Sequence, residues 1–216
     1  MIVTIDGPAG TGKSTVAKTL ASRLGFEFLN TGAMYRAVAY SCLQREIDLA
    51  DTETVGQVPS QLEIVFINSR LLLDGYDVTE AIHGQEVTLV ASVVAANPLV
   101  RDCLVALQRA AARGTSLVTE GRDQGTVVFP EAECKFFITA SPHERAMRRQ
   151  RELQAKGEFI PLEELLSQQA LRDERDQTRT CSPLLPADDA VVIDTTLMSL
   201  EEVAGYLESL VHQRLA

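Results

Sequence analysis

Residues 7–14 read Gly-Pro-Ala-Gly-Thr-Gly-Lys-Ser, and this stretch decides the fold. It follows the apolar run Ile2-Val3-Thr4-Ile5 and precedes an amphipathic segment from Thr15 to Leu24. A buried strand, a glycine-rich turn and a helix N-terminus, in this order, are the context in which the pattern G-x-x-x-x-G-K-[ST] binds nucleotide phosphates. We therefore predict a phosphate-binding loop at the start of an α/β domain.

The residue types in this loop explain how it would hold an anion. Glycines adopt positive φ angles and let backbone N–H groups crowd around a phosphate, and the positive end of the helix dipole points at the same place. Lys13 supplies a cation for the β- and γ-phosphates of ATP, and the Ser14 hydroxyl can ligate Mg²⁺. The predicted ATP-binding residues are Gly7, Pro8, Ala9, Gly10, Thr11, Gly12, Lys13, Ser14 and Thr15.

The charge of the chain narrows the class of ligand. A net charge of −10 argues against broad binding to nucleic acid or to anionic membranes. The chain nevertheless carries 16 Arg against 4 Lys, and seven of the arginines lie between Arg145 and Arg179. The planar fork of arginine binds phosphate bidentately, which predicts small phosphorylated ligands. Arg–Glu pairs on solvated helices account for some of these arginines, including Arg23, Arg45 and Arg214.

The cysteines, the apolar stretches and the N-terminal residues indicate the cellular compartment of the protein. The four cysteines lie far apart without a C-x-x-C pair, so neither a metal centre nor a disulfide framework is expected. The most apolar stretch, residues 87–100, is interrupted by polar residues and by Pro98, which argues against a transmembrane helix. Asp6 interrupts the N-terminus before the apolar core of a signal peptide could form. We expect a cytoplasmic protein.

Hydrophobic patterns predict alternating strands and helices. Strands are expected at residues 26–29, 116–120, 135–139 and 191–194, and helices at 33–43, 85–96, 98–113, 162–177 and after the capping residues Ser141 and Ser199. Residues 62–67 and 71–73 look like antiparallel strands joined by the turn Asn68-Ser69-Arg70, and Val78 begins another short pairing. An antiparallel patch inside a βα chain predicts an inserted subdomain at about residues 55–95.

The loop after the strand at residues 116–120 reads Gly121-Arg122-Asp123-Gln124-Gly125. Ligands of α/β folds bind at the carboxyl ends of the strands, so we expect Arg122 and Asp123 near the phosphates. A turn with a surface Arg–Asp pair is the alternative.

Two expected helices carry arginines at helical spacing. Residues Arg172, Arg175, Asp176 and Arg179 fall on one face, where three arginines repel one another unless an anion or carboxylates lie between them. Arginines 145, 148 and 149 share a face of the helix that Ser141 begins, and a break at Gly157 follows, which predicts a mobile hairpin that closes on ATP. Exposed salt bridges or a solvated helix face are the alternatives in both cases.

Three motifs closely resemble those of the bacterial cytidylate kinases: Thr-Gly-Ala-Met-Tyr-Arg at 31–36, Gly-Arg-Asp-Gln-Gly-Thr-Val-Val-Phe-Pro at 121–130, and Arg-Asp-Glu-Arg-Asp-Gln-Thr-Arg at 172–179. The resemblance covers almost the full chain. It implies a nucleoside monophosphate kinase fold, with a parallel sheet core flanked by helices at residues 1–30 and 96–216, a short lid at about 145–165, and a monophosphate-binding domain at 31–95 that includes the insert. It also implies transfer of the γ-phosphate of ATP to CMP and dCMP by a monomer. From the net charge we expect neither nucleic acid nor membranes as partners.

The resemblance assigns roles residue by residue. By this resemblance, the ligands of the acceptor phosphate are Arg36, Arg122 and Arg179, and the cytosine-side residues are Ser92, Arg101 and Asp123. The residues that look like pentose contacts are Arg172 and Asp176. The CMP set also includes Tyr35 and Thr31, the latter at a position where other members have Ser. The expected catalytic residues are Lys13, Arg122, Arg148 and Arg149, and Ser14 is the expected Mg²⁺ ligand together with the ATP phosphates. Glu120 stands where relatives often have Asp, so its role is left open.

The chemistry of phosphoryl transfer to CMP is consistent with a kinase of this family, and it leaves other nucleotide-binding functions and other acceptors as alternatives. A CMP phosphate oxygen is already anionic, so positioning and charge neutralisation suffice without a general base. Asp123 is therefore interpreted as a hydrogen-bond acceptor for the cytosine amino group. A switch GTPase would carry D-x-x-G and N-K-x-D; Asp123-Gln124-Gly125 has the wrong spacing, and N-K-x-D is absent from the sequence. UMP, AMP, shikimate and dephospho-CoA remain alternative acceptors.

Overall fold

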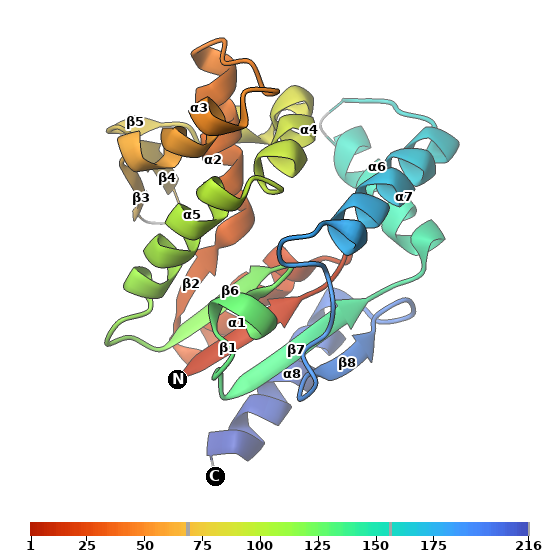
Figure 1. Cartoon of the computed structure of the whole chain (residues 1–216). Coiled ribbons are helices and arrows are strands. Elements are labelled where there is room, and N and C mark those ends of the chain that lie inside the picture. Colours follow the sequence, from red (N-terminus) through yellow and green to blue (C-terminus); the bar gives the residue numbers. More distant parts are fainter. Residues whose placement is uncertain (68–69, 156, 216) are drawn as a thin grey trace. The chain divides into compact units, whose positions relative to one another are not determined.

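The computed structural model describes residues 1–67, 70–155 and 157–215, and the chain forms two compact units (Figure 1). The first unit comprises Met1–Leu29 and Ala112–Ala216, and the second comprises Asn30–Ala111. The sequence placed the end of the second part at residue 95. In the structure it lies at Ala111, because helix α5 (Pro98–Ala111) packs on α3 (Thr52–Gln57) and α2 (Thr31–Gln44) of the same unit.

The first unit is built on a five-stranded sheet with the strand order β2-β6-β1-β7-β8 (Figure 1). Strand β1 pairs in parallel with β6 and β7, and β7 pairs in parallel with β8. The register sets the last residue of β1, Asp6, opposite Gly121 and Phe137. The predicted parallel core is confirmed. The strands are β1 (Ile2–Asp6), β2 (Glu27–Asn30), β6 (Leu117–Gly121), β7 (Cys134–Thr139) and β8 (Val191–Asp194).

Helices α1 (Lys13–Leu24) and α8 (Leu200–Leu215) contact each other and supply the apolar side chains that cover the sheet. Burial of each large aliphatic side chain contributes about 1.5–3 kcal/mol. Ser199, the predicted cap of α8, forms a capping box with Glu202: Ser199 Oγ accepts the Glu202 N–H, and a Glu202 carboxylate oxygen accepts the Ser199 N–H at 2.8 Å. The buried core includes Val3, Ile5, Val16, Leu20, Phe136, Ile138, Val203, Leu207 and Val211.

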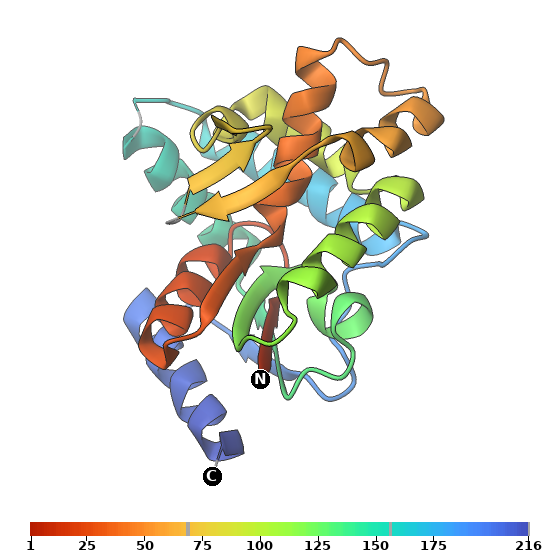
Figure 2. The same cartoon turned by 90° about the vertical axis from the view of Figure 1, so that its left-hand side faces the viewer.

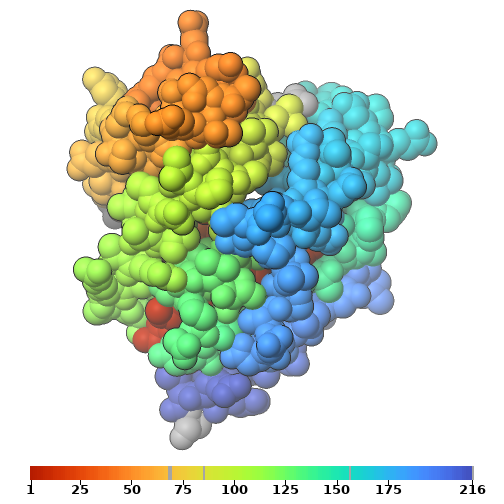
Figure 3. All heavy atoms as spheres, viewed as in Figure 1, coloured from red at the N-terminus to blue at the C-terminus, as the bar shows by residue number. Residues whose placement is uncertain are grey.

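Helices α6 (Pro142–Ala155) and α7 (Leu162–Thr178) pack against each other, and their atoms lie side by side at the right of Figure 3. A small apolar cluster of Ala146, Leu153 and Leu165 holds them together. Ser141 caps α6 by accepting the Glu144 N–H at 3.2 Å, as predicted. The predicted break after α6 falls partly on Lys156, outside the described residues, and continues at Gly157, whose φ is 82°.

The second unit combines helices with a three-stranded antiparallel sheet, whose strands β3 and β4 are the yellow arrows in Figure 2. The strands are β3 (Ile64–Ile67), β4 (Arg70–Leu73) and β5 (Tyr76–Asp77); Asn68 and Ser69 of the predicted turn lie outside the described residues. Asn30 caps α2 by accepting the Ala33 N–H at 2.9 Å. Helix α4 (Gln85–Val94) precedes α5.

The sequence missed several short elements. Helix α3 has six residues, too few for a hydrophobic period to appear, although Asp51 caps it by accepting the Thr54 N–H at 3.0 Å. Single 3₁₀ turns at Val58–Gln61 and Ala81–His83 and a π-helical turn at Gln124–Val128 were missed for the same reason. Within the described residues no single helix is long and apolar enough to cross a membrane; a bent pair, Glu86–Val94 with Pro98–Ala111, meets that test by length and composition only.

Candidate active site

The loop from Gly7 to Ser14 joins the carboxyl end of β1 to the first turn of α1. Gly7 and Gly10 have φ angles of 145° and 78°, which side-chain-bearing residues rarely adopt. A Cβ on Gly7 would lie 2.0 Å from the Ile138 carbonyl oxygen of β7, and one on Gly10 would lie 2.9 Å from Gln169 Nε2 of α7. The glycines therefore serve both the backbone conformation and the close approach of β7 and α7.

The side chain of Lys13 is folded onto its own loop. Its Nζ donates to the Pro8 carbonyl oxygen at 2.6 Å and lies 3.4 Å from Thr11 Oγ1, and the residue is 5% exposed. Burial, followed by the positive charge of Arg122, holds the pKa of Lys13 well below its ordinary value, while Glu120 acts in the opposite direction. An anionic phosphate at this place would favour the charged form of the lysine.

Ser14 and Glu120 form an oxygen pair beside the loop. Ser14 Oγ donates to Glu120 Oε1 at 2.9 Å. Glu120 is the penultimate residue of strand β6 and is 4% exposed. A hydroxyl and a carboxylate are ligands suited to Mg²⁺, so the residues present fit this ion. The sequence left Glu120 without a role; the signal was an acidic residue near the carboxyl end of the strand that precedes the Arg122 loop.

Three arginines come together at one carboxylate. Arg122 Nε donates to Asp176 Oδ2 at 2.8 Å. Burial by itself would raise the pKa of Asp176, but the charge and hydrogen bond of Arg122, with the charges of Arg172 and Arg179, hold it below its ordinary value. The loop after β6 and the arginine face of α7 therefore meet at Asp176. Asp123, the neighbour of Arg122, is also buried, at 3% exposure.

Two arginines of helix α6 donate hydrogen bonds to backbone carbonyl oxygens of the phosphate-binding loop. Arg145 pairs with Asp173 at 2.6 Å and donates to the Ala9 carbonyl oxygen at 3.0 Å. Arg148 donates to the Thr11 carbonyl oxygen at 3.2 Å. Arg149, in contrast, pairs with Glu152 at 3.2 Å on the exposed side of the helix, so the structure does not bring it to the loop. The helical spacing in the sequence placed Arg145 on the same face as Arg148 and Arg149, but Arg145 was not among the expected catalytic residues.

The second unit carries the other predicted CMP residues. Thr31, Tyr35 and Arg36 lie in the first two turns of α2, Ser92 lies on α4 and Arg101 on α5. The Arg101 guanidinium lies 5.6 Å from the centre of the Tyr35 ring, within range of a cation–π contact. Arg101 is 2% exposed and donates to the Ala95 carbonyl oxygen at 3.2 Å. Ser92 Oγ donates to Leu89 O within its own helix at 2.9 Å.

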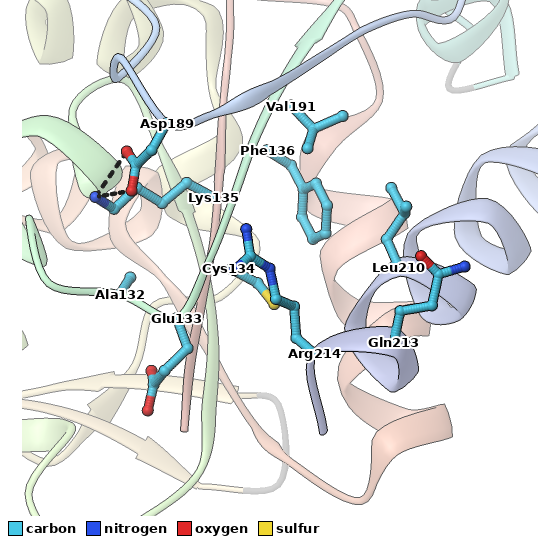
Figure 4. A pocket seen from close by; sticks show the side chains of 10 residues that line it. All are labelled: Ala132, Glu133, Cys134, Lys135, Phe136, Asp189, Val191, Leu210, Gln213 and Arg214. Atoms are coloured by element: carbon cyan, nitrogen blue, oxygen red, sulfur yellow. Dashed lines mark hydrogen bonds and ion pairs between the residues drawn. The ribbon is translucent and has the colours of Figure 1, made fainter. Parts of the chain in front are cut away.

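A cavity of about 570 Å³ lies elsewhere in the first unit, between the start of β7 and the end of α8 (Figure 4). The register of β1 with β7 puts it at the opposite end of the strands from the phosphate loop. Lys135 in its wall already donates to both carboxylate oxygens of Asp189 at 2.9 Å. The cavity contains none of the predicted site residues.

The loop between β1 and α1, the arginines that reach it and the parallel sheet define a P-loop kinase. In fold, the chain is similar to the shikimate kinase of Bacteroides thetaiotaomicron, with a TM-score of 0.50, 12% identity and 98% of both chains covered. The cytidylate kinase family model matches residues 3–213, and the chain belongs to this family, which confirms the resemblance. It is 46% identical over 213 residues to a cytidylate kinase of Rhodopirellula baltica, covering 99% of this chain and 93% of the relative. A cytidylate kinase of Desulfitobacterium hafniense is 46% identical over 215 residues, with 98% and 93% covered.

Proposed function

We propose that the protein transfers the γ-phosphate of ATP to CMP and dCMP, giving ADP and CDP or dCDP. The observation that carries this proposal, beside the family, is the second set of cations next to the donor loop. The charges of Arg122 and Arg172 act directly on Lys13, and both arginines also act on Asp176. A loop that only held one nucleotide would not need arginines from the loop after β6 and from α7 at the same place.

The donor is assigned to Gly7, Pro8, Ala9, Gly10, Thr11, Gly12, Lys13, Ser14 and Thr15. Ser14 and Glu120 would hold Mg²⁺, which when bound neutralises charge on the β- and γ-phosphates. Lys13 and Arg148 act on the same phosphates, whereas Arg149 would act there only after leaving its pair with Glu152. We assign the short lid to about residues 145–165, as the resemblance implies.

The acceptor is assigned to residues of each unit. In the first unit these are Arg122, Asp123, Arg172, Asp176 and Arg179, and in the second Thr31, Tyr35, Arg36, Ser92 and Arg101. An oxygen of the CMP phosphate attacks the γ-phosphorus, the bond from that phosphorus to the bridging oxygen breaks, and ADP leaves. Since the attacking oxygen is anionic, the residues orient the two nucleotides and offset their repulsion, and no side chain removes a proton. The protein is proposed to act as a cytoplasmic monomer.

A panel of acceptors with Mg-ATP tests the proposal, with ADP release as the readout. CMP and dCMP are expected to give the highest kcat/KM. A UMP or AMP value ten times that of CMP would overturn the acceptor, and nucleotide hydrolysis that ignores every acceptor would favour a switch. Lys13→Ala is expected to lose most of kcat, with Lys18→Ala, an exposed lysine of the same helix, as the control. Near-normal turnover by Lys13→Ala would remove Lys13 from the mechanism.

A further inference from the structure

Asp6 is a buried carboxylate to which the roles above assign nothing. It is the last residue of β1, directly before the phosphate loop, and is 4% exposed. Its two oxygens accept different backbone N–H groups: Oδ1 that of Gln124 at 2.9 Å, and Oδ2 that of Gly125 at 2.8 Å. These two N–H groups open the π-helical turn that follows Arg122 and Asp123.

We propose that Asp6 is a positioning residue for the acceptor nucleotide. Its carboxylate ties the segment that carries Arg122 and Asp123 to the end of the strand from which the phosphate loop departs. Donor loop and acceptor residues thereby share one anchor. The inference rests on the proposed function, which assigns Arg122 and Asp123 to CMP.

Neighbouring contacts hold the same segment. Thr119 Oγ1 donates to Gln124 Oε1 at 3.0 Å, and a Cβ on Gly125 would lie 3.0 Å from Thr4 Oγ1. The segment therefore lies against β1 with almost no free space. On its other side Arg122 is bound to Asp176, so a shift at residues 124–125 would be passed to the guanidinium.

The two bonds favour the ionised carboxyl group, because both oxygens of a carboxylate are strong, charged acceptors. Burial, with a smaller addition from Asp123, raises the pKa of Asp6 to about 7, while the two N–H groups and Lys13 act in the opposite direction. Lys13 at the start of α1 and Asp123 after β6 are the charged groups that act on it. Below pH 7 the carboxyl group takes up a proton, and one N–H then faces a hydroxyl oxygen, which is a weaker acceptor.

Asp6→Asn tests the inference, because asparagine has the same shape but one acceptor oxygen. At pH 8 the KM for CMP is expected to rise about tenfold or more, as misplacement of a binding group does. The KM for ATP is expected to change less than twofold, and the melting temperature is not expected to fall, because a buried charge is removed. Glu202→Gln is the matched control: its carboxylate also accepts a backbone N–H, at Ser199, and both KM values should stay unchanged.

The pH profile separates positioning from a purely structural role. CMP itself titrates near pH 6, so the readout is the ratio of variant to wild-type KM. This ratio is expected to fall toward one as the pH drops from 8 to 6, since protonated Asp6 resembles asparagine. Gly125→Ala would place a Cβ 3.0 Å from Thr4 Oγ1 of β1, which presses on the segment that donates the same N–H groups. This variant should also raise the KM for CMP, which keeps the test available where Asp6→Asn fails to fold.

The outcomes distinguish this inference from the proposed function. Equal CMP KM values for variant and wild type at pH 8 overturn the inference, and so does an equal rise in both KM values with a lower melting temperature. Both results leave the kinase intact. A wild-type protein that does not phosphorylate CMP overturns the proposed function, and the inference with it.

Discussion

Arg145 and Arg149 lie four residues apart on α6, yet their surroundings differ enough to predict very different costs of substitution. Arg145 has 6% of its side chain exposed, pairs with Asp173, and donates to the carbonyl oxygens of Ala9 and Ala140. Arg149 and its partner Glu152 have side chains 36% and 62% exposed. Substitution of each arginine by methionine keeps much of the apolar stem and removes the charge.

The magnitude follows from the two environments. Removing one partner of a buried ion pair costs about 3–5 kcal/mol, because the other charge stays behind without compensation. The Asp173 side chain retains 14% exposure, so we expect the lower end, about 3 kcal/mol, for Arg145→Met. Exposed pairs contribute about 0–1 kcal/mol, so Arg149→Met is expected to cost under about 0.5 kcal/mol. For a chain of this length the first change should lower the Tm by roughly 6–12 °C.

Urea and thermal unfolding followed by far-UV circular dichroism measure the two costs, since the chain has no Trp for fluorescence. The double variant Arg145→Met/Asp173→Leu is expected to recover a large part of the loss, because it removes the charge left without a partner. A loss below about 1 kcal/mol for Arg145→Met, or an equal loss for Arg149→Met, would refute the reasoning. Loss of the bond to the Ala9 carbonyl should also raise the KM for ATP.

Three further predictions concern acidic residues. Glu120→Gln is expected to raise the Mg²⁺ concentration for half-maximal activity about tenfold, because the carboxylate charge next to Ser14 is lost. An unchanged Mg²⁺ titration would contradict this prediction. Glu27→Gln, at an exposed glutamate, is the control. Asp176→Asn should raise the KM for CMP about tenfold, because Arg122 loses its charged partner; an effect on ATP alone would contradict the assignment. Asp6 keeps its proton up to about pH 7 in the folded chain but only to about pH 4 when unfolded, so its contribution to the free energy of unfolding falls as the pH rises from 4 to 7. The stability of the wild type relative to Asp6→Asn should therefore be lower at pH 8 than at pH 5 in urea unfolding, and a difference independent of pH would exclude the raised pKa.

Local patterns explain the parts of the fold that could be predicted. A strand, glycines and a helix start within fifteen residues define the phosphate loop, and the capping residues Ser141 and Ser199 define where α6 and α8 begin. The spacing of Arg172, Asp176 and Arg179 follows the helical period, so their common face needed no tertiary information. Helix α3 was missed because six residues do not complete two helical turns.

The sequence predicted those residues of the candidate site that belong to a local pattern, such as the glycine-rich loop or the helical spacing of the arginines. It did not predict which of the site residues contact one another. Arg148 and Arg149 are neighbouring residues of the same type, so the sequence gives no reason to treat them differently. In the structure Arg148 donates to the Thr11 carbonyl oxygen, whereas Arg149 pairs with Glu152, and only the packing of α6 on the loop decides this difference. Glu120 and Ser14 are 106 residues apart, and Asp6 and Gln124 are 118 apart. No local periodicity links residues at such distances.

The sequence by itself thus determined the glycine-rich loop between β1 and α1 and the parallel α/β class, and it predicted which arginines would bind a second phosphorylated ligand. Those properties depend on backbone conformation and side-chain periodicity, which a few neighbouring residues specify. The tertiary structure alone decided which charges meet: Arg122 with Asp176, Arg145 with Asp173, and Asp6 with the N–H groups that follow Asp123. Hydrogen bonds and ion pairs act over about 3 Å, so their partners are known only once strand register and helix packing have placed them.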